Sequence, residues 1–429
     1  MSCSTDQRNW RSRCVSSWGG SVLDSPIPLH SGWELRTLGE LVTKIGSGAT
    51  PRGGKEVYVE RGTPFIRSQN VVDHRMLSDD IAYIGDEAAR ALSGVTVRRG
   101  DVLLNITGDS IARCALVDPV LESARVNQHV AIIRTSNLLD PVFLQKYLVN
   151  PAFKRFMISH SSGATRKALT KRQIEQFPIL VPPRSEQEAI AAVLGALDEK
   201  IAVNERVATT SDALASARHR WTAITSAGKF ERLGRLAQVV VGGTPSRAKP
   251  EYWTGGTVHW INSGKANDFR VIQPSEMITE EGLANSSVKL MPPGATLIGI
   301  TGATMGQISR LEITAGGSQN VAGVWSDDQA LNDWLFYDIR FRVADLTKHA
   351  SGGAQQHINK RVITELECRV PFSDDLREWS AGTAPLVKLS AQVLLENRAL
   401  ATLRDALLPQ LMSGRLRVKD AEKIVEDAT

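Results

Sequence analysis

The sequence predicts a mixed α/β (α+β) protein built from two copies of one domain and two long, antiparallel coiled-coil helices. Three observations lead to this expectation. Short motifs recur once along the chain at a distance near 190 residues. After Pro182-Pro183 the composition changes into a long stretch without proline. Near the C-terminus, apolar residues recur every seven positions, as they do in a coiled coil.

The internal repeat is a duplication of a whole domain. The matches are collinear, and their offset drifts only from 195 to 189 residues, which indicates small changes of loop length. Repeats of a solenoid are far shorter, about 20 to 50 residues, so a solenoid is excluded. The matched segments include 38–41 with 233–236, 48–51 with 242–245, 100–108 with 294–302, 127–131 with 318–322, and 171–172 with 360–361.

Each copy is expected to contain short elements joined by long loops. A strand follows Gly100 and its counterpart Gly294, because apolar residues alternate there. Asp140-Pro141 is typical of a helix start, with an N-cap and a proline at the first helical position. A first short helix is predicted from the spacing of Leu38, Leu41, Val42 and Ile45. It is expected to end at residues 48–51, which match 242–245; each of these segments is called a Gly-Thr-Pro turn.

Two long helices follow the two copies. Ser185 and Glu188 have the spacing of a capping box at the start of the first helix. The second helix is expected to end at Leu408-Pro409. Asn204 and Asn397 occupy equivalent places, where a buried asparagine would fix the register, although both could simply be exposed. The residues expected in the seam between the helices are Ile190, Leu197, Ile201, Asn204, Leu386, Val393, Asn397 and Leu400.

The composition is that of an ordinary folded protein. There are 51 Lys and Arg against 46 Asp and Glu, a net charge of +5 that is compatible with a nucleic-acid partner. The four cysteines are scattered without a CxxC pair, which favours reduced thiols over a zinc site or disulfides. No apolar stretch approaches the ~20 residues that cross a bilayer, so a cytoplasmic location is expected. Residues 1–31 are interpreted as a flexible leader.

No catalytic constellation is found in the sequence. The GxxxxGK[ST] phosphate loop and the Gly-rich dinucleotide fingerprint are both missing. His219 is interpreted as part of a solvated helix face. Asp101 and Asp109 could hold a metal, but the second copy has Ala295 and Ala303 there. The chain is therefore expected to have no enzymatic activity of its own and no metal site.

Several of these features together resemble the specificity subunit of type I restriction–modification systems. One is the junction Pro182-Pro183-Arg184-Ser185-Glu186-Gln187-Glu188-Ala189-Ile190, and another is the ending Leu408-Pro409-Gln410-Leu411-Met412-Ser413-Gly414. The resemblance covers about residues 32–418. The second junction, Pro371-Phe372-Ser373-Asp374, lacks the Glu-Gln pair, so this motif does not fix the start of the second helix.

The resemblance implies a division of labour. Each target-recognition domain would read one half of a split, double-stranded DNA site. The helices would set the gap and dock two modification (methyltransferase) subunits. S-adenosylmethionine, ATP and Mg²⁺ would be bound by the modification and restriction subunits, with no cofactor in this chain. The expected segments are a leader (1–31), recognition domain 1 (32–182), a central spacer helix (183–226), recognition domain 2 (230–372), a C-terminal spacer helix (376–418) and a tail (419–429).

Candidate DNA-binding residues lie in three places of each copy. These are the Gly-Thr-Pro turns (48–51 and 242–245), the segments that follow a strand (66–70 and 262–265), and a later loop (162–167 and 352–357). Cations and hydroxyls suit phosphates, whereas amides and guanidinium groups read base edges. The matched pairs Asn127-Gln128 and Gln319-Asn320 are given less weight, because they could equally cap a turn. The candidates are Thr50, Arg52, Arg67, Ser68, Gln69, Asn70, Thr165, Arg166, Lys167, Lys171, Thr244, Ser246, Arg247, Asn262, Ser263, Lys265, Gln355, Gln356 and Lys360.

Three other functions stay open at this point. The chain could be a stand-alone DNA-binding protein without a modification partner. It could be a nuclease with an unrecognised site, in which case the purified chain would cut plasmid DNA with Mg²⁺. It could also be a protein-interaction scaffold, which would lack DNA affinity at any salt concentration.

Overall fold

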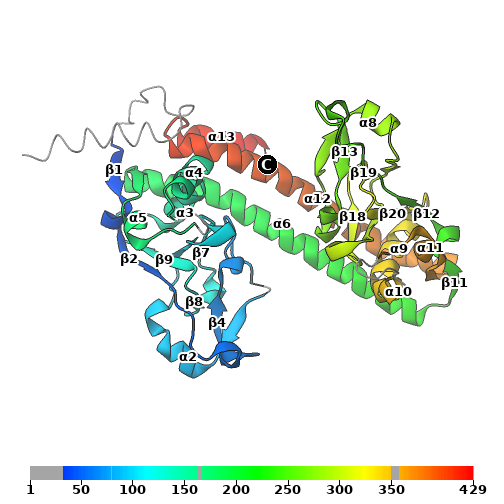
Figure 1. Cartoon of the computed structure of the whole chain (residues 1–429), viewed down its shortest axis with the longest axis horizontal. Helices are drawn as coiled ribbons and strands as arrows, with labels where there is room; N and C mark the ends of the chain where they lie inside the picture. The colour runs from blue at the N-terminus through cyan, green and yellow to red at the C-terminus, as the bar shows by residue number, and fades with distance from the viewer. Residues whose placement is uncertain (1–31, 79, 163–166, 349–356, 429) are drawn as a thin grey trace, which may run out of the picture. The chain divides into compact units, whose positions relative to one another are not determined.

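The computed structural model describes residues 32–78, 80–162, 167–348 and 357–428 (Figure 1). The chain divides into two compact units. Of the described residues, those up to 201 and from 400 onward form unit 1, and those between 202 and 399 form unit 2. Each unit therefore contains one copy of the duplicated domain and a part of both long helices. No helix in the described part of the chain is long and apolar enough to span a membrane.

Unit 1 is built on two four-stranded sheets and one strand pair. The first sheet is purely antiparallel, whereas β4 and β8 of the second run parallel. In order across the sheets, the strands are β2 (Val42–Ser47), β9 (Val130–Thr135), β6 (Val102–Asn105) and β7 (Cys114–Leu116); then β3 (Tyr58–Val59), β5 (Ala82–Ile84), β4 (Thr63–Ile66) and β8 (Arg125–Val126); and the pair β1 (Glu34–Thr37) with β10 (Pro178–Val181).

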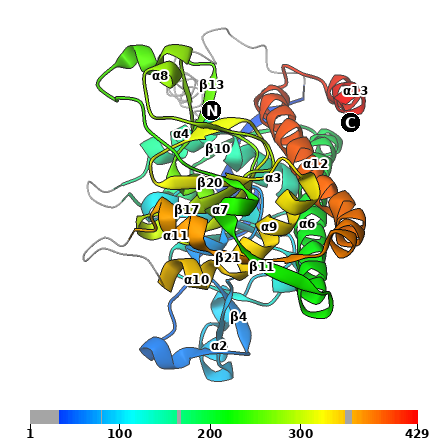
Figure 2. The ribbon, with the colours of Figure 1, turned by 90° about the vertical axis from the view of Figure 1, so that its right-hand side faces the viewer.

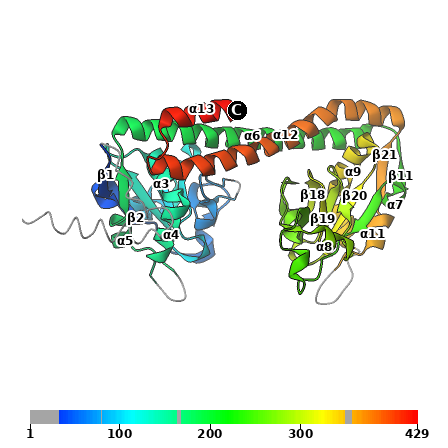
Figure 3. The same cartoon turned by 90° about the horizontal axis from the view of Figure 1, so that it is seen from above.

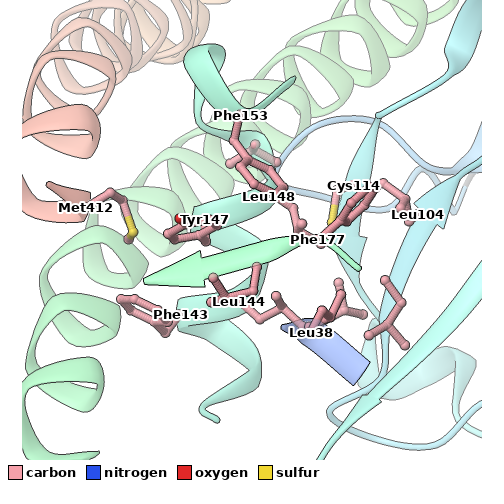
Figure 4. Close-up of a cluster of buried hydrophobic side chains, with 14 of the residues drawn as sticks. Leu38, Leu104, Cys114, Phe143, Leu144, Tyr147, Leu148, Phe153, Phe177 and Met412 are labelled. Carbon is pink, nitrogen blue, oxygen red and sulfur yellow. The ribbon is translucent and has the colours of Figure 1, made fainter. Parts of the chain in front are cut away.

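Helices cover one face of the first sheet and enclose the largest apolar core of this unit. Tyr147, Phe153 and Phe177 meet edge to face, with ring centroids 4.9 Å and 5.6 Å apart (Figure 4). Met412, near the end of the second long helix, closes the same core. The helices of unit 1 outside the long pair are α2 (Asp86–Ala91), α3 (Pro141–Val149), α4 (Pro151–Ser159), α5 (Lys171–Glu175) and α13 (Val418–Ala428), of which α13 packs onto the same core through Ala421 (Figure 3).

Unit 2 repeats the strand order of unit 1. The order β12-β20-β17-β18 matches β2-β9-β6-β7, and β15-β13-β19 matches β5-β4-β8. The strands are β11 (Gly228–Arg232), β12 (Gln238–Val241), β13 (Val258–Ile261), β14 (Arg270–Val271), β15 (Glu276–Ile278), β16 (Leu290–Met291), β17 (Thr296–Gly299), β18 (Ile308–Leu311), β19 (Ala315–Gly317), β20 (Val321–Trp325) and β21 (Glu367–Pro371).

The duplication also extends to the backbone of single turns. Gly100 and Gly294 precede the matched strands β6 and β17 with φ of +84° and +87°, which other residues rarely adopt. Helix α9 packs against the first long helix, α6 (Arg184–Thr225), as Figure 2 shows. The shorter helices are α7 (Leu233–Leu236), α8 (Glu280–Ala284), α9 (Gln329–Phe341), α10 (Val343–Lys348) and α11 (Lys360–Glu365).

The two predicted long helices are confirmed as α6 (Arg184–Thr225) and α12 (Ser373–Met412). Residues of increasing number in α6 contact residues of decreasing number in α12, so the two helices are antiparallel. The side-chain hydrogen bonds are Asn204 to Glu396 (3.0 Å), Ser390 to the carbonyl of Ala208 (3.1 Å), and Arg218 to Thr383 (3.3 Å) in unit 2, and Arg404 to Asp198 (2.8 Å) in unit 1.

The predicted seam residues lie inward. Asn204 and Asn397 are 3% and 8% exposed, so the reading of both as surface residues does not apply. Asn204 donates to Glu396, which ties it to the facing helix. The apolar members are buried or partly buried: Ile190, Leu197, Ile201, Leu386, Val393 and Leu400.

Some local predictions were wrong. The short helix expected over residues 38–45 is only a turn, Leu38–Glu40, followed by strand β2. The β-branched residues Val42, Thr43 and Ile45 favour a strand, and Leu38 and Leu41 are buried beside it. His219 is 1% exposed, against the expected solvated face, because rings of Trp334 and Trp379 enclose it.

The ends of the long helices also differ from expectation. The predicted capping box does not form, because α6 already begins at Arg184, whose guanidinium pairs with Glu188 at 2.8 Å. Glu186 instead accepts from the indole N–H of Trp33 at 2.9 Å. Helix α12 begins at Ser373 rather than 376, and it continues through Pro409 to Met412. A proline in the last turn removes only one helical hydrogen bond, so the helix tolerates it there.

Candidate nucleic-acid interface

In unit 1, loops that follow four different strands meet at one edge of the two sheets. They are the Gly-Thr-Pro turn after β2, the segment after β4, the turn after β8 and the segment after β6. Because separate strands deliver them, their relative positions are fixed by the sheets. Three backbone hydrogen bonds join them: Ala49 to Val126 (3.0 Å), Asn127 to Ile66 (3.0 Å) and Ile106 to His129 (2.9 Å).

Unit 2 assembles the same loops in the same way. Here the turn after β12 meets the segments after β13, β19 and β17. Their three hydrogen bonds are the counterparts of those in unit 1: Gly243 to Gly317 (2.8 Å), Ser318 to Ile261 (2.9 Å) and Ile300 to Asn320 (3.0 Å). These four segments are therefore neighbours in both copies, although they are up to about 80 residues apart in the chain.

A threonine–glutamine pair fastens the Gly-Thr-Pro turn in each copy. The hydroxyl of Thr50 donates to Gln128, and the hydroxyl of Thr244 donates to Gln319. The preceding glycine is required, because a Cβ at Gly48 would lie 2.2 Å from a carbonyl oxygen of the facing strand. The two glutamines were only weak candidates in the sequence, and their recurrence in both copies was the signal that could have raised them.

The later loop of unit 1 joins this edge through Thr107. The Thr107 hydroxyl lies 2.6 Å from Nδ1 of His129, and its backbone bridges to Ala168. The amide of Gly108 donates to the carbonyl of Lys167 at 3.3 Å, which places exposed Lys167 beside the cluster. In unit 2 the matching bridge joins Thr301 to His357. The candidates Thr165, Arg166, Gln355 and Gln356 lie outside the described residues.

In the segment after β4, some side chains hold the turn and others are exposed to a ligand. Asn70 is 1% exposed, and its side chain bonds the amide of Arg67 and the carbonyls of Leu77 and Asp80, so it holds the turn. Arg67 donates to the Asp80 carboxylate at 3.1 Å, and exposed Gln69 donates to the same carboxylate. Ser68 uses its carbonyl to bond Asn105 at 2.8 Å. Arg67, Ser68 and Gln69 therefore remain candidates here, and the arginine and the glutamine share the Asp80 carboxylate.

The segment after β13 starts with an Asx turn. The side-chain oxygen of Asn262 accepts from the amide of Gly264 at 2.9 Å, which leaves its NH₂ group exposed. Ser263 begins the short helical turn Ser263–Asn267. Lys265 pairs with Asp268 at 2.7 Å. The two copies thus present different polar groups on equivalent frames.

The remaining candidates lie at the rim of the same loops. Arg52 and Ser246 are exposed in the Gly-Thr-Pro turns, and Arg247 pairs with Glu276. Lys171 and Lys360 are the exposed first residues of α5 and α11. These two lysines begin short helices that follow the later loop of each copy.

Two aspartates of α6, the partly buried Asp198 and the buried Asp212, fasten each copy to the long helices. In unit 1, Asp198 pairs with Lys146 of α3 and lies 3.5 Å from His74. Burial opposes ionisation of Asp198, but hydrogen bonds and the charges of His74 and Lys146 outweigh it and lower the pKa of this carboxyl. In unit 2, Asp212 accepts from Tyr337 at 3.1 Å and from Arg340 at 2.9 Å.

Other chemistry has little support in the described residues. Asp101, a conceivable metal ligand, is fully buried and bonds Arg134 through both oxygens at 2.7 Å. Across the described ranges, no group of three His, Cys, Asp or Glu side chains is arranged to hold a metal ion. Cys114 and Cys368 are buried free thiols, and burial raises the pKa of both, so neither is a reactive thiolate.

Comparison with known proteins decides which family these features belong to. Residues 30–209 match the family of the type I restriction modification DNA specificity domain. The type I restriction enzyme HindI specificity subunit of Haemophilus influenzae is 20% identical to the chain, over 82% of the chain and 94% of that protein. Residues 30–209 thus carry the type I restriction modification DNA specificity domain, and most of the chain is similar to specificity subunits of type I restriction enzymes.

Two further proteins are similar to the chain over nearly their whole length. The putative type I restriction enzyme MjaX specificity subunit of Methanocaldococcus jannaschii is 19% identical, with 90% of the chain and 94% of that protein aligned. The crystal structure of a type I restriction–modification S subunit from M. genitalium superposes with a TM-score of 0.57 at 14% identity, over 89% of the chain and 96% of that structure. The latter likeness concerns the fold.

Proposed function

We propose that this chain is the DNA-reading, non-catalytic subunit of a type I restriction–modification complex, in which each unit reads one half of a split DNA site. One observation carries the proposal. The same four loops are assembled twice by the same backbone bonds, while the side chains on them differ. A shared frame with different polar groups is what two unlike half-sites require, because bases are distinguished by amide and guanidinium side chains.

The two units would use their loops in a common way. The Thr50–Gln128 and Thr244–Gln319 pairs hold the turns, and the backbone and hydroxyls there suit phosphate contacts. Gln69 in unit 1 and Asn262 in unit 2 offer exposed side-chain amides after equivalent strands. We assign base reading to these segments, together with the later loop that begins beside Lys167.

Helices α6 and α12 contribute to both units, so we propose that they set the number of base pairs between the half-sites. We also propose that their outer faces dock two modification subunits. S-adenosylmethionine would then be bound by the modification subunits, and ATP and Mg²⁺ by restriction subunits. A stand-alone DNA-binding protein is not favoured, because the relatives along the whole chain are named as subunits of restriction enzymes.

Mapping methylated adenines tests the proposal in cells that carry the chain and a type I modification subunit. A split motif with a constant gap is expected. In the Gln69→Ala variant the base preference should relax in one half-site only, and in Asn262→Ala in the other only. The exposed Gln238→Ala, at the start of β12 and away from the reading loops, is a matched control and should leave both halves unchanged. A motif without a gap, or relaxation of both halves by one variant, would refute it.

A further inference from the structure

A carboxylate and an aromatic ring hold Arg247 of unit 2. Its two terminal nitrogens donate to the two oxygens of Glu276, at 2.7 and 2.6 Å. Its guanidinium carbon lies 3.5 Å from the centre of the Trp253 ring. A planar, two-bond pair of this kind is the arrangement in which arginine also binds phosphate or guanine. Glu276 therefore occupies the end of the guanidinium that DNA would use.

The turn that carries Arg247 is itself fixed. The indole N–H of Trp253 donates to the carbonyl of Ser246 at 3.2 Å, and that of Trp260 donates to the carbonyl of Gly243 at 3.0 Å. The Thr244 hydroxyl bonds Gln319 on the same turn. Because the backbone on both sides of the turn is anchored, the position of the guanidinium is set in advance of any ligand.

Unit 1 has the same frame without the carboxylate. Trp260 pairs with Glu276 across β13 and β15, and the equivalent pair across β4 and β5 is Phe65 with Ala82. The ring pair is also repeated, since Tyr58 and Phe65 lie 6.1 Å apart where Trp253 and Trp260 lie 5.3 Å apart.

An arginine follows the Gly-Thr-Pro turn in both copies. It is Arg52 in unit 1, one residue closer to the proline than Arg247. The carboxylate that pairs with Arg247 in unit 2 is thus replaced by an alanine methyl group at the equivalent strand position of unit 1.

We propose that Glu276 is a specificity-determining residue of unit 2, whose carboxylate occupies Arg247 in place of a DNA phosphate until other contacts displace it. This inference rests on the proposed function, since it requires that the loops of unit 2 bind DNA. Non-specific binding depends almost entirely on the number of phosphates neutralised by cations. Because Glu276 neutralises Arg247, unit 2 has one cation fewer to offer to phosphates. Binding to wrong sequences, which offer no further contacts, is therefore weakened.

The pair is suited to a reversible role. The side chains of Arg247 and Glu276 are 54% and 42% exposed, and exposed ion pairs are weak and screened by salt. The hydrogen bonds from Arg247 lower the pKa of the Glu276 carboxyl, so it stays ionised near neutral pH. A phosphate that approaches Arg247 can therefore exchange with the carboxylate without disturbing the buried core.

The test compares Glu276→Gln with Glu280→Gln in the full-length chain. Both variants remove one exposed negative charge from unit 2, but Glu280 lies on α8, and among the described residues it is Glu276 that forms the ion pair with Arg247. The probe is a fluorescent 30-base-pair duplex of mixed sequence, titrated between 50 and 200 mM salt. Glu276→Gln should bind roughly three- to tenfold more tightly at low salt, and its plot of log affinity against log salt should steepen by about 1.

The same comparison in the Arg247→Ala variant shows whether the effect of Glu276→Gln depends on the arginine. There, Glu276→Gln should have no effect. The inference is overturned if Glu276→Gln binds the duplex no better than the parent chain, if Glu280→Gln strengthens binding equally, or if the gain persists without Arg247. If no version of the chain binds the duplex at any salt concentration, the proposed function itself fails. Equal thermal unfolding midpoints confirm that the variants are folded.

Discussion

The two units share their strand order but differ in the charged groups that attach each to the long helices. In unit 1, Asp198 of α6 meets Lys146 of α3, and Arg404 of α12 joins it. In unit 2 a different residue of α6, Asp212, meets two residues of α9. This difference indicates that the alternating apolar residues kept the sheets alike after duplication, while the charged contacts to the long helices diverged.

The reading edge shows the same contrast on a smaller scale. Both units keep the threonine–glutamine pair and the backbone bonds that gather the loops. They differ in the carboxylates that face the candidate cations, which are Asp80 for Arg67 in unit 1 and Glu276 for Arg247 in unit 2. The shared contacts fix the positions of the loops, and the carboxylates that differ change which cations are available to DNA.

The largest effect is expected for the attachment of unit 1. Asp198→Ala leaves Lys146, which is 3% exposed, without its partner, and removing one member of a buried pair costs about 3–5 kcal/mol. Hydrogen exchange should show loss of protection in unit 1 and little change in the sheets of unit 2. Asp405→Ala is the control, because this exposed carboxylate also pairs with Arg404. Equal loss in both units would contradict separate attachments.

His219 gives unit 2 a pH dependence of its own. Burial lowers the pKa of His219 to about 3, so the folded unit does not bind a proton there between pH 6.5 and about 3, whereas the unfolded chain does. The free energy of unfolding should therefore fall as the pH is lowered through this window, by at most about 1.4 kcal/mol per pH unit. Burial raises the pKa of neighbouring Asp338, which offsets part of this loss.

The variant His219→Gln isolates the contribution of the histidine. Its unfolding free energy, measured by denaturant titration at several pH values, should depend less steeply on pH than that of the parent chain. The slope is the informative quantity, since the absolute stability also changes with the packing between Trp334 and Trp379. Identical slopes in both proteins would show that His219 is not held neutral.

A moderate effect is expected for the threonine–glutamine pairs. Thr50→Val removes one hydrogen bond, which contributes about 0.5–1.5 kcal/mol, so affinity for the first half-site should fall roughly two- to tenfold. Thr244→Val should do the same at the second half-site. Binding to duplexes mutated in one half-site measures this. If either variant weakened both halves equally, the turns would not act within their own units.

The smallest effect separates the two arginines of the Gly-Thr-Pro turns. Arg52→Ala should reduce the slope of log affinity against log salt by about 1 on a mixed-sequence duplex. Arg247→Ala should change it less, because Glu276 already neutralises this guanidinium. Equal slopes for the two variants would remove the distinction drawn between the copies.

Much of the fold could be predicted because it depends on periodic apolar residues. The duplication and the antiparallel long helices follow from such patterns, and the Asp140 side chain caps α3 as expected. The strand β2 was missed because Leu38, Leu41 and Ile45 happen to have helical spacing, while tertiary pairing with β9 decides the conformation.

The candidate interface was harder to predict than the fold. Polar residues such as Asn70 look alike in a sequence whether they bond the backbone or face solvent, and only the fold reveals that Asn70 is buried. The pairing of Arg247 with Glu276 joins residues 29 positions apart and depends on strand register. Gln128 and Gln319 carried a signal in their repetition, but their threonine partners could be recognised only in space.

Footprinting of the full-length chain, assembled with its modification subunits, on a duplex that carries the methylated motif tests the two-reader account most directly. Two protected segments separated by a constant, less protected gap are expected. Gln69→Ala should weaken protection of one segment, and Asn262→Ala that of the other. A single uninterrupted footprint, or loss of both segments in either variant, would contradict the account.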